Sequence, residues 1–187
     1  LFADNYYNID EWLINTKKVE TEEKLGLSTY TVEVVQGGCS NGLLARVFNC
    51  STWPWKSVPS EEAKLLALAR NPWKNLAPTY EPGAKKAKQV RHKPVVVMCD
   101  LGLDRSATVV FTALLVQMIY AGKKIDCDAL FRKFRDQRAG VFTNSMFFTA
   151  AIRAVLTHMR DKLKVKWASE VDNINSALLK IPAPQKK

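Results

Sequence analysis

The chain has 187 residues, of which 47% are hydrophobic and 25% are charged, so it can form a folded domain with a sizeable core and is neither disordered nor fibrous. Its formal net charge of +10 favours anionic partners such as nucleic acid, anionic lipid or acidic protein surfaces. No uncharged apolar run reaches the length of a membrane span, and the first residues lack the basic start and apolar core of a signal peptide. The chain does not begin with Met, which indicates a processed or excised piece.

The four cysteines are widely spaced and form no CxxC pair; they are Cys39, Cys50, Cys99 and Cys127. With two histidines in the whole chain, we expect no zinc site, no other metal and no cofactor. Free thiols in a reducing compartment are the simplest interpretation, which predicts an intracellular location, cytoplasmic or nuclear.

In chain order, the first predicted elements are two strands, over 29–35 and 43–50. Both are rich in β-branched and apolar residues, and the turn-rich QGGCSNG between them predicts a hairpin. Two prolines make 51–60 a loop. Ser60 is a suitable N-cap for a helix over 61–70.

A basic run follows, in a stretch that begins with prolines and a glycine and reads as a loop; its members are Lys85, Lys86, Lys88, Arg91, His92 and Lys93. It is either a solvated loop or a docking patch for an acidic partner. No aromatic residues alternate with these charges, which argues against binding of single-stranded nucleic acid.

The second half predicts one buried strand and three helices. Residues 93–98 form a continuous apolar strand, as at the buried centre of a sheet. Residues 105–121 form a helix that is apolar nearly all round and ends at Gly122. Asp126 and Asn144 are N-caps of helices reaching about 137 and 163, the second with Phe147, Ala151 and Val155 on one face. We expect one domain over 1–165, followed by a C-terminal helix and tail over 166–187 whose end is disordered.

The stretch VVVMCDLGLDRSATVV joins the predicted strand to the buried helix through a short loop. Backbone N–H groups and the helix dipole make such a loop an anion site. Cys99 at its start would be a nucleophilic thiolate, and Arg105, after five intervening residues, would hold two phosphate oxygens. Asp100 and Asp104 place two negative charges in the same loop, which raises the question of what the loop can bind.

Two further stretches, Trp53-Pro54 upstream and QRAGVFTNSMFFTAAIRAVL (137–156) downstream, complete a pattern. Together with the loop they resemble the protein tyrosine phosphatases in order and approximate spacing, and the style of TKKVE (16–20) and GCSNG resembles nematode members. The resemblance covers the C-terminal part of that domain. It implies an α/β (α+β) fold, with a central mixed twisted sheet flanked by helices and a phosphate loop between a buried strand and a helix. The remainder of the domain is expected on a preceding segment.

The resemblance also assigns roles by position. The phosphate loop comprises Cys99, Asp100, Leu101, Gly102, Leu103, Asp104, Arg105 and Ser106. The family's histidine before the cysteine is replaced by Met98, its general acid by Trp55, and its two downstream glutamines by Thr143 and Phe147. Loss of a general acid typically removes about 10²–10⁴ in rate. Cys99 and Arg105 are therefore interpreted as vestigial.

These replacements favour a pseudophosphatase, a protein-binding scaffold in signalling that recognises a phosphorylated or acidic segment of a partner such as a kinase. One alternative is a weakly active cysteine-dependent phosphatase. Another is a basic module that binds nucleic acid or an anionic membrane. Three local questions stay open: whether Cys99 is a buried small hydrophobe, whether Arg105 pairs with Asp100 or Asp104 instead of an anion, and whether Trp55 packs in the core or contacts a partner.

Overall fold

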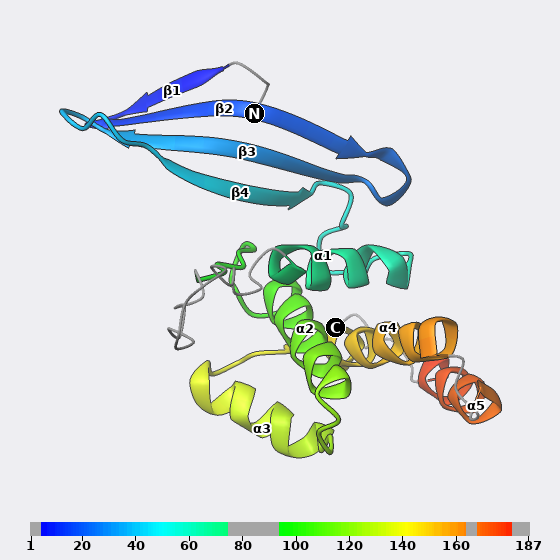
Figure 1. Ribbon diagram of the computed structural model, residues 1–187. Coiled ribbons are helices and arrows are strands. Elements are labelled where there is room, and N and C mark those ends of the chain that lie inside the picture. Colours follow the sequence, from blue (N-terminus) through cyan, green and yellow to red (C-terminus); the bar gives the residue numbers. More distant parts are fainter. Residues whose placement is uncertain (1–4, 75–93, 164–167, 181–187) are drawn as a thin grey trace, which may run out of the picture. The chain divides into compact units, whose positions relative to one another are not determined.

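The computed structural model describes residues 5–74, 94–163 and 168–180. The chain divides into two compact units, Leu1–Trp53 and Pro54–Lys187, the first built from strands and the second from helices (Figure 1). The predicted α+β class is confirmed. The basic run at 85–93 and the predicted disordered end at 181–187 lie outside the described residues.

The first unit is a four-stranded antiparallel sheet in which each strand pairs with its neighbour in the sequence (Figure 1). Its strands are β1 (Tyr6–Ile9), β2 (Trp12–Glu22), β3 (Leu27–Gln36) and β4 (Leu43–Cys50). The predicted hairpin is confirmed as β3–β4, and TKKVE lies in β2. The predicted mixed sheet is not found in the described part of the chain. The short connections here allow antiparallel pairs alone, since a parallel pair needs a long crossover.

One face of this sheet is mainly apolar. The strand register aligns Tyr7, Ile14, Val34 and Leu43 in one row across the four strands. Ile9 and Trp12 belong to the same face, because side chains two residues apart on a strand point the same way. Several members of this face are 40–63% exposed: Tyr7, Ile9, Trp12 and Leu43.

A short 3-10 helix, η1 (Glu23–Leu25), turns β2 into β3 and ends at Gly26. Gly26 has a φ of 60°, in the left-handed region that favours glycine. A Cβ at this position would also lie 2.5 Å from Thr52 Oγ1. Both the backbone and the packing therefore require glycine at this turn.

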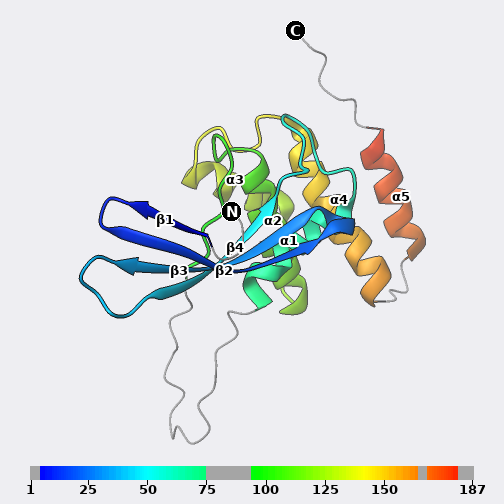
Figure 2. The ribbon, with the colours of Figure 1, turned by 90° about the horizontal axis from the view of Figure 1, so that it is seen from above.

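The second unit contains α1 (Glu62–Lys74), α2 (Arg105–Tyr120), α3 (Cys127–Gln137), α4 (Ser145–Leu163) and α5 (Ala168–Leu179). Helix α2 is buried along most of its length and packs against α1 and α4, while α5 packs beside α4 (Figure 2). The predicted caps at Asp126 and Asn144 are confirmed, because Asp126 accepts from Ala129 N at 3.0 Å and Asn144 from Met146 N at 2.9 Å. Helix α1 begins at Glu62 rather than at 61, so Ser60 is not at its N-cap position. Among the described residues no helix is long and apolar enough to cross a membrane.

An aromatic cluster joins α2, α3, α4 and the segment between the last two. Phe111 of α2 is fully buried, with its ring centroid 5.1 Å from Phe134, 5.7 Å from Phe142 and 5.2 Å from Phe148. The predicted apolar face of α4 packs into this core, with Phe147 and Ala151 both buried. The cluster therefore fixes the segment that precedes α4 against the start of α2.

The prediction of a buried strand at 93–98 is wrong over the described residues 94–98. These residues pair with no strand in the described part of the chain, and Val96 and Met98 are 77% and 84% exposed. Exposure alternates along the segment, as in an extended chain with period two. A strand needs a partner for its backbone groups, and apolar composition alone does not supply one.

Candidate functional site

The loop 99–106 lies at the N-terminal end of α2, which begins at Arg105. Asp104 is at the N-cap position, but its side chain makes no capping hydrogen bond; its backbone carbonyl accepts from Thr108 N and Oγ1, both at 2.8 Å. Gly102 has a φ of 67°, and a Cβ there would lie 3.2 Å from Arg138 Nη2. The loop therefore turns sharply where glycine permits it and delivers Arg105 and Ser106 into the helix.

Cys99 faces a group of hydrogen-bond donors. Its Sγ lies 3.3 Å from Ser106 Oγ, and the Ser106 backbone N–H donates to it at 3.5 Å. Partial burial raises the pKa of the Cys99 thiol, but the hydrogen bond with the Ser106 hydroxyl and interactions with the amides of Ser106, Gly102 and Leu101 outweigh burial and lower the pKa overall. Where the sequence predicts an anion site, the Cys99 sulfur accepts the Ser106 backbone N–H.

Arg105 and Asp100 form an ion pair within the loop. Arg105 Nη2 donates to Asp100 Oδ2 at 2.6 Å. The Arg105 side chain is 23% exposed, while that of Asp100 is 56% exposed. The arginine that would hold a phosphate is therefore engaged by a carboxylate that water reaches easily.

Asp104 points elsewhere and is held by Thr143. Its Oδ1 accepts from Thr143 N and its Oδ2 from Thr143 Oγ1, both at 2.7 Å. The structure thus brings Thr143 to the loop, as the resemblance predicts, but its hydroxyl binds the loop aspartate.

Two further hydrogen bonds tie the same segment to the loop. Arg138 Nη2 donates to Leu101 O at 2.8 Å, and Phe142 N donates to Leu103 O at 3.2 Å. Phe142 has a φ of 57°, unusual for a bulky residue, and its buried ring in the aromatic cluster holds it there. We call residues 138–143 the clamp segment.

The remaining predicted positions do not join the cradle. Phe147 is buried in the core, with 3% of its surface exposed. Met98 and Leu101 point outward, with 84% and 71% exposed. Trp55 is 69% exposed, and Lys56 Nζ lies 4.3 Å from its ring centroid, so of the two alternatives for Trp55 core packing is not found. Pro54 separates Trp55 from the buried Trp53, which is the tryptophan that packs.

Sequence reasoning missed Arg138 and Phe142. Both lie in the QRAGVF stretch that carries the resemblance, and the resemblance assigns a role to neither. Gly140 between them, with a φ of 77°, was the available signal of a tight turn.

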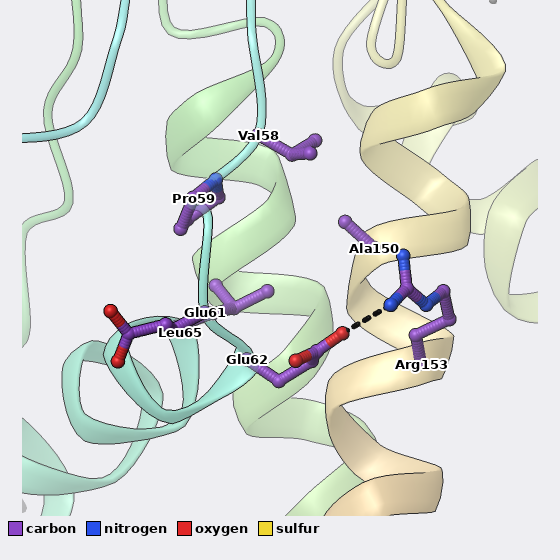
Figure 3. Close-up of a pocket in the computed structure, with 7 residues that line it drawn as sticks. All are labelled: Val58, Pro59, Glu61, Glu62, Leu65, Ala150 and Arg153. Atoms are coloured by element: carbon purple, nitrogen blue, oxygen red, sulfur yellow. Dashed lines mark hydrogen bonds and ion pairs between the residues drawn. The ribbon is translucent and has the colours of Figure 1, made fainter. Parts of the chain in front are cut away.

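A separate small pocket lies where the segment before α1 meets α1 and α4 (Figure 3). Across it, Glu62 of α1 and Arg153 of α4 form an ion pair. Its other lining residues are Val58, Pro59, Glu61, Leu65 and Ala150. The pocket shares no residue with the loop, and we interpret the pair as a tie between two helices.

Within the described ranges, no group of three or more His, Cys, Asp or Glu side chains is arranged to hold a metal ion. All four cysteines are free thiols. The chemistry of the site therefore has to be argued from the loop and the clamp segment.

Comparison with known families identifies the class to which this fold and loop belong. The sequence profile described as protein-tyrosine phosphatase matches residues 2–157, which is most of the chain. The chain therefore belongs to the protein-tyrosine phosphatase family, and the predicted family is confirmed.

Individual relatives agree with this assignment. The chain is 25% identical over 146 residues to a Caenorhabditis elegans protein named "Putative tyrosine-protein phosphatase C15H7.3", covering 77% of this chain and 32% of that protein. It is 22% identical over 153 residues to human receptor-type tyrosine-protein phosphatase epsilon, covering 79% and 20%. It is 30% identical over 118 residues to receptor-type tyrosine-protein phosphatase N2 of Macaca nemestrina, covering 63% and 10%. The chain thus spans about a third or less of the length of these relatives.

Proposed function

We propose that this phosphatase-like domain does not hydrolyse phosphotyrosine and acts instead as a scaffold that binds an acidic or phosphorylated segment of a partner protein, such as a kinase. The observation that carries the proposal is the Arg105–Asp100 ion pair. Because the guanidinium is already paired, a substrate phosphate has to compete for the group that should orient it.

The position of the general acid supports the same conclusion. By its resemblance to the family, the residue in that position is Trp55, whose indole N–H is a donor that does not supply a proton to a leaving phenolate. Loss of general-acid catalysis costs about 10²–10⁴ in rate. Trp55 is exposed and free to serve as a contact for a partner, a role in which tryptophan is enriched.

The positions that should orient the hydrolytic water support it as well. The Thr143 hydroxyl donates to Asp104, and the Phe147 side chain is buried and apolar. Neither side chain is placed to hold water against a cysteinyl-phosphate. A domain that formed such an intermediate would release it slowly.

The proposal includes a second segment of protein. The exposed apolar face of the sheet, at Tyr7, Ile9, Trp12 and Leu43, is a surface that usually packs against other structure. We expect the remainder of the phosphatase-like domain on a preceding segment to cover it. The free thiols fit the intracellular setting, cytoplasmic or nuclear, that the proposal assumes.

One observation favours a second candidate function, a weakly active cysteine-dependent phosphatase. The hydrogen bonds that lower the pKa of Cys99 also increase its thiolate fraction near neutral pH, which is the form that attacks phosphorus. This candidate requires Arg105 to leave Asp100 during turnover.

Phosphate release from a phosphotyrosyl peptide separates the two candidates. We expect no release above background by the wild type and no difference from Cys99→Ser. Release that disappears in Cys99→Ser would establish the second candidate and overturn the first. Calorimetry with the same peptide should show binding that is lost in Arg105→Met and retained in Arg132→Met, an exposed arginine of α3 that serves as the matched control.

A further inference from the structure

The two sides of the loop differ in how firmly they are held. On the clamp side, Asp104, Leu103 and Leu101 each accept hydrogen bonds from the clamp segment. On the other side, Asp100 is anchored by its contact with Arg105 and is more than half exposed. Asp100 can therefore swing away while the backbone of the loop keeps its shape.

The cradle beneath Asp100 is already formed. The Ser106 backbone N–H donates to the Cys99 sulfur at 3.5 Å, and Arg105 lies one residue before it at the start of α2. A ligand with several acceptor oxygens can use this donor together with the guanidinium once the carboxylate has moved. Entry of such a ligand breaks the ion pair between Arg105 and the half-exposed Asp100, and an ion pair that water reaches is a weak interaction.

From this geometry we infer that Asp100 is a displaceable internal ligand of Arg105, which makes the loop select phosphorylated segments over segments that are merely acidic. The inference rests on the proposed function and names the partner chemistry of the same site.

The selectivity follows from a competition between anions. A partner glutamate offers Arg105 a carboxylate like that of Asp100, but Asp100 belongs to the same loop and has the advantage of high effective concentration. A phosphate monoester carries a charge of about −1.5 to −2 and three strong acceptor oxygens. It can hold Arg105 bidentately and also accept from the loop amides, so it alone outcompetes Asp100.

The test uses three short peptides, Ac-Ala-Ala-X-Ala-Ala-NH2, in which X is phosphotyrosine, glutamate or tyrosine. Their binding is measured by calorimetry on the wild type, Asp100→Asn and Asp128→Asn. Asp128 is a highly exposed aspartate of α3, so its variant changes the net charge equally without touching the loop. Circular dichroism checks that each variant folds.

We expect the wild type and Asp128→Asn to bind the phosphotyrosyl peptide and not the glutamyl peptide. Asp100→Asn should bind the phosphotyrosyl peptide about two- to fivefold more tightly, because Arg105 loses a competitor with which it forms a weak ion pair. It should also gain measurable binding of the glutamyl peptide. The tighter phosphotyrosyl binding and the new glutamyl binding should both vanish in the double variant Asp100→Asn with Arg105→Met. That loss would show that both peptides bind through the Arg105 guanidinium.

Equal affinities in Asp100→Asn and Asp128→Asn would overturn the inference, as would equal binding of the two charged peptides by the wild type. Absence of phosphotyrosyl binding in every folded variant would overturn it too. Phosphate release by the wild type would overturn only the proposed function. In that case the peptides are measured again on the same variants carrying Cys99→Ser, which cannot form a cysteinyl-phosphate. The competition between Asp100 and the peptide for Arg105 is unchanged there, so the same order of affinities is expected.

Discussion

Asp100 and Asp104 occupy one loop, four residues apart, and the structure uses them in opposite ways. Asp104 binds the backbone and the hydroxyl of Thr143 and fastens the loop to the clamp segment. Asp100 binds Arg105, the residue that an anion would need. The comparison teaches that a negative charge in an anion cradle can be structural or competitive, depending on which donor its side chain reaches.

The largest effect is expected from removing the support of the clamp side. Phe142→Ala deletes a buried ring from the aromatic cluster and should lower the free energy of unfolding by about 3–5 kcal/mol. Chemical denaturation measures this loss. Phe142→Leu, which keeps most of the apolar volume, should lose clearly less; an equal loss would mean that the strained backbone, rather than packing, dominates.

Asp104→Ala breaks the contact with Thr143 directly. Two hydrogen bonds to a carboxylate are lost at a partly exposed site, so unfolding should become easier by about 1–2 kcal/mol. Thermal denaturation tests this expectation. A double-mutant cycle with Thr143→Ala tests the contact of the two side chains, because this variant removes the hydroxyl and keeps the backbone N–H. The cycle should show a favourable coupling energy between Asp104 and Thr143. Additive effects would contradict a hydrogen bond between their side chains.

Ser106→Ala tests the donors around Cys99. The hydroxyl helps lower the pKa of this thiol, so its removal should raise the pKa and shift the pH profile of alkylation by iodoacetamide to higher pH. Mass spectrometry of the Cys99 peptide gives the rate at each pH. Exposed Cys39 in the same sample is the internal reference, and the pH profile of its alkylation should be the same in the wild type and in Ser106→Ala.

The smallest effect on stability is expected at Asp100. Asp100→Asn removes an exposed ion pair and should change the free energy of unfolding by less than about 1 kcal/mol. Denaturation alongside Asp104→Asn provides the contrast. If the two variants lost the same stability, the distinction between a structural and a competitive aspartate would fail.

Elements defined by local patterns could be predicted from the sequence. The β3–β4 hairpin follows from two apolar runs around a turn-rich stretch, and the caps at Asp126 and Asn144 follow from single residues before amphipathic helices. Strand β1 was missed because Tyr6–Ile9 is short. Helix α1 continues past the predicted end at Arg70 and includes Pro72, which lacks the N–H that would bond to Leu68 O; the helix ends two residues later, at Lys74.

Features that depend on distant partners could not be predicted. The segment 94–98 has the composition of a buried strand, but composition does not reveal whether a pairing strand is present. The sequence showed two aspartates near Arg105 and left their partners open. Thr143, which decides the orientation of Asp104, lies 39 residues further along the chain, and that distance closes only in the folded structure.

The order of the sheet also has a consequence for synthesis. Every strand of the first unit pairs with its neighbour in the sequence, so the residues that pair are close together along the chain. The sheet can therefore form as soon as β4 leaves the ribosome. At roughly 5–20 residues per second, Arg105 emerges several seconds later, whereas a hairpin closes in roughly 1–10 µs. The preceding segment that we expect to cover the apolar row of Tyr7, Ile14, Val34 and Leu43 leaves the ribosome earlier still, so the row can be covered before the loop of Arg105 is synthesised.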